Sequence, residues 1–290
     1  MPLKKLWNNP KVRLALVFVL LVVAGISIGV IIESNVAEYQ SRQKQQELQQ
    51  LYTVGSSSQS PSADIQGQPY ANPQFGQLLE INPDLIGWLD VGTYSGPVVQ
   101  TDNNEYYLNH DFYGKEDKHG TIYLDTRNRL DEMDDNLVLY GHNYSKSQQL
   151  FYEVEKYKDP AYAAQYPTIT FTTLYEKRTY QVFAAFMSNT DPQQGEVFNY
   201  HNQLRFREAK AMNTFLADVR ARSMIDTNLE VDAYDQLLTL STCGYDFAGQ
   251  RYVVVARLLR PGEDGETAVE YTKAENPLLP EAWVRLYGKK

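Results

Sequence analysis

The stretch LSTCGYDFAGQRYVVVARL, residues 240–258, predicts two adjacent β-strands and contains the only cysteine of the 290-residue chain. Apolar and β-branched residues dominate both of its ends, and the two glycines of GYDFAGQ suit a loop between antiparallel strands. Such a loop places the strand ends side by side, so we expect Arg251 to reach the Cys243 sulfur. A guanidinium there would stabilise a thiolate or a developing oxyanion. The alternative is that Cys243 is a buried, inert hydrophobic residue.

Short runs of the same kind precede this stretch, and a short helix is expected at 77–84. The two final strands, 236–243 and 251–259, complete a predicted set whose other members are 86–91, 97–100, 121–125, 136–142, 168–173 and 178–187. Their short connections indicate a mostly antiparallel sheet. Eight short strands with few helices predict a closed barrel, because closure removes exposed strand edges.

One long helix is expected before the penultimate strand, within residues 204–223. Leu204, Ala211, Phe215 and Val219 recur there at helical spacing, with charged residues between them. This helix is predicted to pack one face on the sheet. The fold class is therefore mainly β: a closed eight-stranded barrel with an N-terminal helix, this long helix, and a transmembrane helix at the N-terminus.

The N-terminus carries an uncharged, apolar run at residues 14–32. As a helix it spans roughly 28 Å, about one bilayer core. Basic residues precede it, namely Lys4, Lys5, Lys11 and Arg13, and Glu33 follows it, so the positive-inside rule predicts a cytoplasmic N-terminus and an extracellular remainder. A cleaved signal peptide is the alternative, but the run is longer than usual and lacks a small-residue cleavage site.

Composition divides the rest of the chain. We expect a basic cytoplasmic flank at 1–13, a membrane anchor at 14–32, a helical stalk and flexible linker at 33–74, a catalytic domain at 75–260 and a C-terminal extension at 261–290. The extension is expected to fold back onto the barrel. The net charge of −9 argues against nucleic acid as a partner.

A nucleophilic cysteine needs a proton partner, and His142 is the best placed of the four histidines. It follows the apolar strand NLVLY through a glycine, at a strand end entering a loop. Solvated or structural roles are the default for the other three, His110, His119 and His201.

The sequence resembles the sortases, specifically class B, which are membrane-anchored cysteine transpeptidases of Gram-positive bacteria. The resemblance covers roughly residues 81–258, and its elements here are NPDLIGWL, PVVQTDNNEYYLNHDFYGK, GTIYLD, LVLYGHN, the long helix, and TLSTC with an arginine opening the next strand. The YYLNHDFYGK stretch and the long helix favour class B.

The resemblance implies that Cys243 attacks a threonine carbonyl in a C-terminal sorting motif of a secreted protein, while Arg251 holds the oxyanion and His142 acts as acid and base. It also implies substrate contacts for Asn104, Leu108, Ser241 and Thr242, with ordinary packing as the alternative for each. No cofactor or metal is implied. Gly244 departs from relatives with a larger residue after the cysteine, so the exact motif does not carry over.

The acceptor and the activity itself leave alternatives open. The first hypothesis is transfer to an amine of the peptidoglycan precursor in cell-wall anchoring, at the plasma membrane. A pilus polymerase would use a pilin lysine instead, and a catalytically silent surface-binding domain would merely bury Cys243. The acidic run DEMDD, 131–135, lacks the ligand spacing of a calcium loop, so a solvated acidic loop is expected there.

Overall fold

The computed structural model describes residues 10–55, 72–144, 147–265 and 269–288. Most of the expected linker, together with Lys4 and Lys5, lies outside the described residues. The chain divides into two compact units, Met1–Glu47 and Leu48–Lys290.

The first unit is formed by most of helix α2, Pro10–Gly55. Its apolar side chains between Leu14 and Ile32 are exposed, which is the reverse of what a water-soluble helix shows. Among the described residues it is the one helix long and apolar enough to cross a membrane. By length and composition it fits a membrane anchor or a signal sequence.

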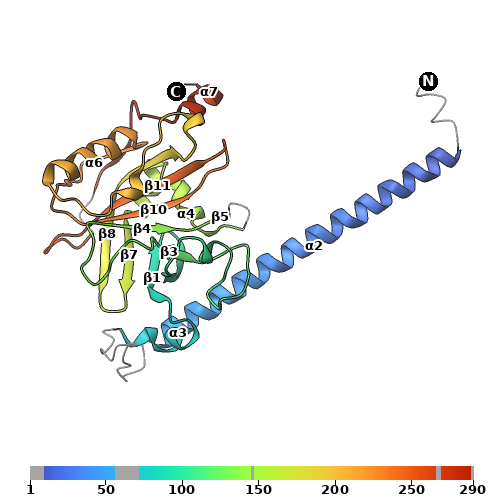
Figure 1. Cartoon of the computed structure of the whole chain (residues 1–290), viewed down its shortest axis with the longest axis horizontal. Coiled ribbons are helices and arrows are strands. Elements are labelled where there is room, and N and C mark those ends of the chain that lie inside the picture. The colour runs from blue at the N-terminus through green and yellow to red at the C-terminus, as the bar shows by residue number, and fades with distance from the viewer. Residues whose placement is uncertain (1–9, 56–71, 145–146, 266–268, 289–290) are drawn as a thin grey trace. The chain divides into compact units, whose positions relative to one another are not determined.

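The second unit is built on a closed barrel of eight strands, and all eight coincide with the strands predicted from the sequence (Figure 1). They are β1 Leu85–Val91, β2 Tyr94–Val99, β3 Ile122–Leu124, β4 Asn136–Tyr140, β7 Thr168–Thr173, β8 Lys177–Asn189, β10 Leu237–Cys243 and β11 Gln250–Leu258. Their order is β1-β2-β3-β4-β10-β11-β8-β7, and β1 pairs with β7 to close the barrel. The pairs β2–β3 and β4–β10 are parallel and the others antiparallel.

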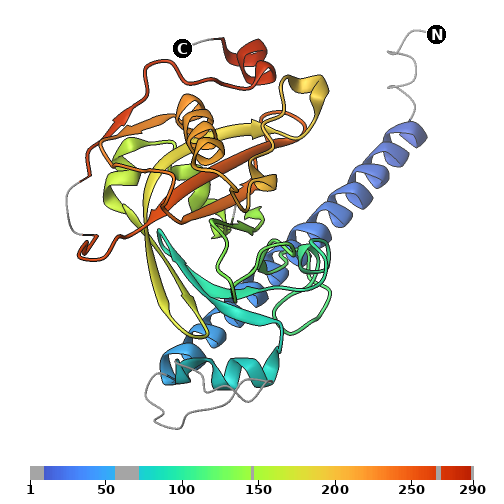
Figure 2. The ribbon, with the colours of Figure 1, turned by 60° about the vertical axis from the view of Figure 1, so that its left-hand side comes forward.

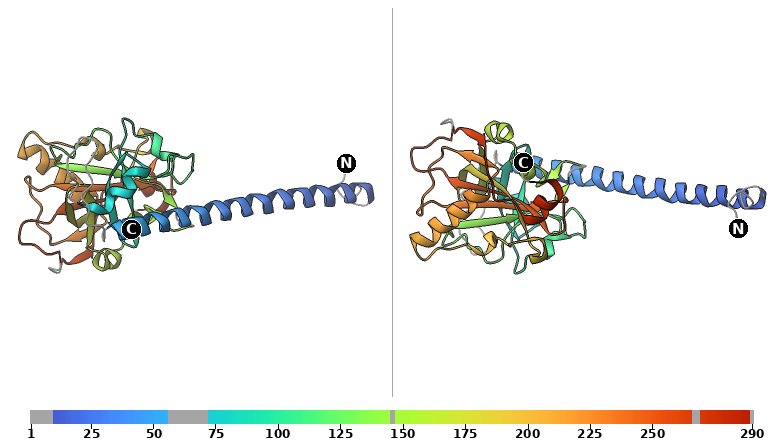
Figure 3. Two further views of the ribbon diagram at one scale, coloured as in Figure 1. Left: turned by 90° about the horizontal axis from the view of Figure 1, so that it is seen from below. Right: turned by 90° about the horizontal axis from the view of Figure 1, so that it is seen from above.

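Helix α6, Ala209–Arg222, covers one outer face of the barrel (Figure 3). Its buried stripe consists of Met212, Phe215, Leu216 and Val219, which have the i, i+3, i+4, i+7 spacing of one helix face. The expected Ala211 is exposed because it lies beside this stripe, and Leu204 precedes the helix. The predicted helix is therefore confirmed, but two of the four residues predicted for its apolar face, Leu204 and Ala211, do not lie on that face.

Strand β8 is buried on both faces, because the barrel core covers one and α6 covers the other. Val182 and Ala185 point into the core, whereas Phe183 and Ala184 pack under α6. The change of phase coincides with a register irregularity in the pairing with β11. Strand alternation lets β8 face two apolar layers, and the bulge at Phe183 shifts which residues face each layer.

The last turns of α2 pack within the second unit beside the short helices η1, Pro73–Phe75, and α3, Gly76–Ile81. The ring of Tyr52 stacks on Trp88 with centroids 4.1 Å apart. The compact unit consequently begins at Leu48, ahead of the boundary expected at residue 75.

Several short elements lie in loops for which no helix or strand was predicted. They are η2 Tyr106–Leu108, β5 Asn143–Tyr144, β6 Gln149–Leu150, α4 Tyr152–Lys156, α5 Pro160–Gln165, η3 Pro192–Gln194 and η4 Tyr200–Asn202. Such elements are too short to show a hydrophobic period, so the sequence pattern alone does not reveal them.

The C-terminal extension folds back onto the barrel unit, as the sequence predicted. Its strand β12, Tyr271–Lys273, pairs with β9, Ile225–Thr227, and its helix α7 spans Glu281–Tyr287. Leu279 and Trp283 pack against the barrel core.

Candidate active site

Cys243 is the last residue of β10, and Arg251 lies directly opposite it on β11. Opposite residues of an antiparallel pair project from the same face of the sheet. The cysteine is a free, half-buried thiol. Arg251 donates from Nη1 to its neighbouring Gln250 carbonyl at 2.9 Å, and within the described part of the chain it forms no ion pair. Its guanidinium therefore keeps donors available on the strand opposite Cys243.

His142 is brought to Cys243 by the parallel pairing of β4 with β10. Beyond the last register pair, the Gly141 N–H donates to the Ser241 carbonyl at 3.3 Å and the Thr242 hydroxyl donates to the Gly141 carbonyl at 2.7 Å. These two bonds extend the strand contact to the residue before His142. The predicted histidine and the predicted nucleophile thus stand at adjacent strand ends.

The imidazole of His142 is oriented by a hydrogen bond of 2.8 Å between Nε2 and the Leu108 carbonyl. A carbonyl oxygen only accepts, so Nε2 must carry a proton. In the neutral ring Nδ1 then holds the lone pair, and in the charged ring Nδ1 holds the exchangeable proton. Leu108 belongs to η2, so this turn fixes the tautomer of the neutral ring.

A pocket of about 290 Å³ opens over these side chains. All seven residues singled out from the sequence line it: Cys243, His142, Arg251, Asn104, Leu108, Ser241 and Thr242. Its other lining residues are Tyr123, Tyr140, Gly141, Thr190, Tyr200 and His201. The arrangement brings together a thiol, an imidazole and a guanidinium in a partly enclosed space.

The four residues expected to contact a substrate differ in what they leave free. Asn104 accepts from the Thr126 N–H through Oδ1 at 2.8 Å, which turns its amide group so that Nδ2 remains a donor. The hydroxyls of Ser241 and Thr242 are both engaged inside the protein, Ser241 with Tyr200 at 2.7 Å. Asn104 therefore keeps an amide donor available, whereas the Leu108 carbonyl is bonded to His142 and the two hydroxyls are bonded within the wall of the pocket.

Sequence reasoning missed several lining residues, most clearly His201. We expected a solvated or structural role for it, but η4 places it among the residues that line the pocket. Burial and the charge of Arg127 lower the pKa of His201. Tyr140 was detectable, because it lies two residues before His142 and strand alternation puts both on one face. No local pattern marks His201.

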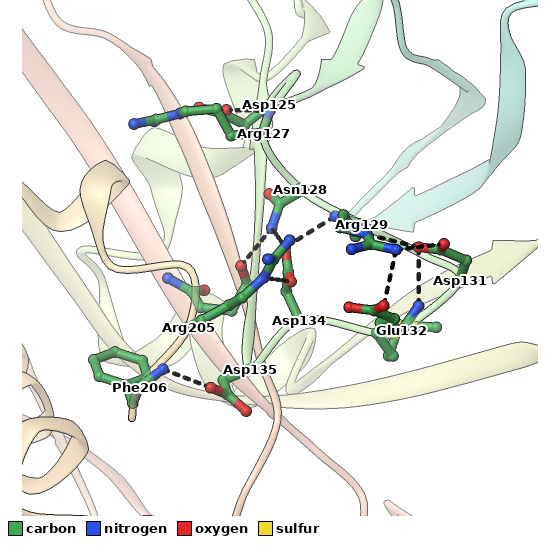
Figure 4. A network of polar contacts seen from close by, with 12 residues as sticks. Asp125, Arg127, Asn128, Arg129, Asp131, Glu132, Asp134, Asp135, Arg205 and Phe206 are labelled. Atoms are coloured by element: carbon green, nitrogen blue, oxygen red, sulfur yellow. Dashed lines mark hydrogen bonds and ion pairs between the residues drawn. The ribbon is translucent and has the colours of Figure 1, made fainter. Parts of the chain in front are cut away.

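The ion pair between Asp125 and Arg127 (Figure 4) connects the residue after β3 to η4. Asp125 accepts from Arg127 at 2.8 and 2.9 Å and from the Tyr140 hydroxyl at 2.9 Å. Burial alone would raise the pKa of Asp125, but the hydrogen bonds from Arg127 and Tyr140 outweigh it and lower the pKa. Arg127 also donates to the His201 carbonyl and to Asn202 Oδ1, both at 2.8 Å. This pair fixes the wall that carries His201.

The acidic loop 131–135 is tied to the protein itself (Figure 4). Asp134 accepts from the Asn128 side chain, the Arg129 N–H and Arg205, and Asp135 accepts from the Phe206 N–H at 2.7 Å. Two of its carboxylates are thus oriented by protein donors. Across the described residues, no group of three or more His, Cys, Asp and Glu side chains has the arrangement of a metal site.

Comparisons with known proteins agree with this chemistry. A family model described as the Sortase domain matches residues 92–259. Sortase B of Staphylococcus aureus is 30% identical over 85% of this chain and 97% of its own length, and Sortase B of Listeria monocytogenes is 28% identical over 64% and 74%. A solved structure of a Staphylococcus aureus sortase B–substrate complex superposes with a TM-score of 0.66 at 29% identity, covering 77% of this chain and 98% of that one.

Proposed function

Because the chain belongs to the sortase family of cysteine transpeptidases, we propose that it cleaves a C-terminal sorting motif after threonine and transfers the acyl group to an amine of the peptidoglycan precursor. The observation that carries the proposal is the pairing of Cys243 with Arg251 beside His142 in one pocket. The Staphylococcus aureus relative has been solved with a substrate, which supports a substrate site in the matching pocket.

In the first half-reaction the Cys243 thiolate attacks the threonine carbonyl carbon, and the carbonyl oxygen gains the negative charge. The Gly244 N–H already donates to the Gln250 carbonyl at 3.0 Å, so we assign the oxyanion to the free donors of Arg251. The carbon–nitrogen bond then breaks. The leaving amine takes its proton from Nδ1 of the charged His142, and a thioester on Cys243 remains.

In the second half-reaction an acceptor amine attacks the thioester carbonyl. Nδ1 of His142, now neutral, takes the proton from the attacking nitrogen, and Arg251 again holds the oxyanion. The carbon–sulfur bond breaks and returns the thiolate. The Leu108 carbonyl keeps the ring in one orientation throughout, so a single nitrogen serves both steps.

We assign the enzyme to the plasma membrane, with α2 as an uncleaved anchor, its N-terminus in the cytoplasm and the barrel outside. The exposed apolar surface of α2 and the basic residues ahead of residue 14 support this assignment. Secreted proteins that carry the sorting motif would then reach the pocket without crossing another barrier.

The test is cleavage of a peptide library containing threonine-bearing motifs by the detergent-solubilised full chain. Wild type should release the downstream peptide and show a mass increase on Cys243. Cys243→Ala should abolish both while leaving thermal unfolding unchanged, and His142→Ala should slow cleavage by about 10²-fold or more. Adding glycine peptides or a lysine side-chain amine identifies the acceptor. Cleavage retained by Cys243→Ala would reject the proposal.

A further inference from the structure

The C-terminal segment 269–288 lies beyond the region matched by the family model, which ends at residue 259. It is nevertheless ordered against the barrel unit. The Ala274 N–H donates to the Met224 carbonyl at 3.0 Å, and the Leu278 N–H donates to the Ala221 carbonyl at 2.7 Å. These bonds hold the segment along β9 and the end of α6, and α7 follows at one end of the barrel (Figure 2).

Helix α7 meets the loop that follows β8 at close range. A Cβ at Gly195 would lie 2.9 Å from the Cβ of Glu281, so only glycine permits this approach, and its φ of +117° also favours glycine. Arg285 donates to Gln194 Oε1 at 3.1 Å. The same loop begins with Thr190, which lines the active-site pocket.

Helix α7 also reaches the turn between β10 and β11. Trp283 packs on the barrel core and lies against the Tyr287 ring, with centroids 4.4 Å apart. The Tyr287 hydroxyl donates to Asp246 Oδ1 at 3.4 Å. Asp246 is therefore contacted by the extension from outside the turn.

Asp246 is linked to the catalytic arginine through Gln250, which is fully buried. The Asp246 N–H donates to Gln250 Oε1 at 2.8 Å, and Gln250 Nε2 donates back to Asp246 Oδ2 at 3.0 Å. The Gln250 carbonyl in turn accepts from the Gly244 N–H and from Arg251 Nη1. A shift of the turn would thus move the carbonyl that orients the guanidinium.

The two loops are also bonded to each other. The Thr190 N–H donates to the Gly249 carbonyl at 2.9 Å, and the Thr190 hydroxyl donates to the same oxygen at 3.2 Å. Gly249 has a φ of +77° at this point. The β8 loop and the β10–β11 turn consequently form one assembly, and α7 contacts both of its parts.

We propose that the C-terminal extension is a brace that holds this assembly, and with it Arg251, in the catalytic geometry. Trp283 and Tyr287 are positioning residues, because they act through Asp246 and Gln250 and do not line the pocket. The inference rests on the proposed acyl transfer for its functional meaning. The polar contacts of α7 are exposed and individually weak, so a change of about tenfold in rate is expected.

The experiment compares the full chain with a form ending at residue 280, with Trp283→Ala, and with Leu286→Ala as a matched control. Leu286 is an exposed neighbour on α7. We expect kcat for peptide cleavage to fall about tenfold in the shortened form and in Trp283→Ala, with KM within about twofold of wild type. In the control, Leu286→Ala, kcat should stay unchanged. Measurement at 20 °C, below unfolding, separates this effect from lost stability.

A mutant cycle tests whether the brace acts through the turn. Asp246→Ala should lower kcat, and combining it with Trp283→Ala should add little, because both changes interrupt one chain of contacts. Wild-type kcat in Trp283→Ala, or full additivity in the cycle, would overturn the proposal.

A second measurement, the alkylation rate of Cys243, tests the brace independently of the proposed peptide cleavage. The rate of Cys243 alkylation by iodoacetamide should change in the shortened form and in Trp283→Ala but not in Leu286→Ala, whether or not any sorting peptide is cleaved. If wild type cleaves no peptide, acyl transfer fails while these rates still decide the brace. Identical alkylation rates in all four proteins would reject it.

Discussion

The two ends of the β10–β11 hairpin use arginine in opposite ways. At one end Arg251 lies opposite Cys243, and among the described residues it has no carboxylate partner. At the other end Arg257 lies opposite Leu237, is 1% exposed, and donates to both carboxylate oxygens of Glu263 at 2.7 and 3.1 Å. One guanidinium has no carboxylate partner among the described residues, and the other is paired with a carboxylate.

This difference separates stability from chemistry within one pair of strands. A buried charge that is paired resists removal, because its partner would be left unsatisfied. An unpaired guanidinium at a pocket contributes little to folding but can bind charge that develops during a reaction. Substitutions at the two ends should therefore have opposite signatures.

The largest effect is expected from Arg251→Ala. Loss of the oxyanion donor should lower kcat for peptide cleavage by about 10²–10³-fold, with a thermal midpoint close to wild type. Arg251→Lys keeps the charge but not the forked donors, so it should recover only part of the rate. Steady-state kinetics and a thermal melt measure both quantities. A kcat within a few fold of wild type would remove Arg251 from the mechanism.

A smaller effect, of the opposite kind, is expected from Arg257→Met. Methionine fills much of the space but leaves Glu263 without its partner, so we expect a loss of about 1–3 kcal/mol in the free energy of unfolding. Urea unfolding measures this loss, while kcat of the folded enzyme should stay near wild type. A large fall in kcat without a change in stability would contradict the assignment of Arg257 to stability alone.

The smallest effect is expected in the pH dependence of the stability that Glu263 contributes. Hydrogen bonds from Arg257 lower the pKa of Glu263 in spite of its partial burial. A lowered folded-state pKa contributes stability above the unfolded value of about 4.3, and this contribution is lost as pH falls through the folded value. Glu263→Gln should thus be less stable than wild type at pH 7, and the difference should be smaller near pH 3. Urea unfolding at both values checks this, and an unchanged difference would contradict it.

The strands were predictable because each is marked by its own residues. Apolar and β-branched runs such as NLVLY and YVVVA sit between polar loops, and all eight reappear in the barrel. The pairing of β4 beside β10 was not predictable, because a parallel contact between distant segments leaves no local pattern. That contact is what brings His142 to Cys243.

The residues of the candidate site also divide into those that were predictable from the sequence and those that were not. Cys243 and Arg251 were readable as neighbours because a short loop joins their strands, and His142 because it ends a strand. The place of His201 in the pocket was not predictable from the sequence, because it depends on the hydrogen bonds from the Arg127 side chain to η4. The buried face of α6 was shifted for a related reason, as the barrel surface selects the stripe it covers.

By itself the sequence determined the apolar N-terminal helix, the set of barrel strands and the candidate residues Cys243, His142 and Arg251, which the structure brings into one pocket. These follow from local composition, spacing and the single thiol. Only the tertiary structure decided which strands are neighbours, which nitrogen of His142 is bonded to the Leu108 carbonyl, and that a C-terminal helix contacts the turn between Cys243 and Arg251. Each of these depends on hydrogen bonds between segments far apart in the chain, whose partners are chosen by the folded barrel.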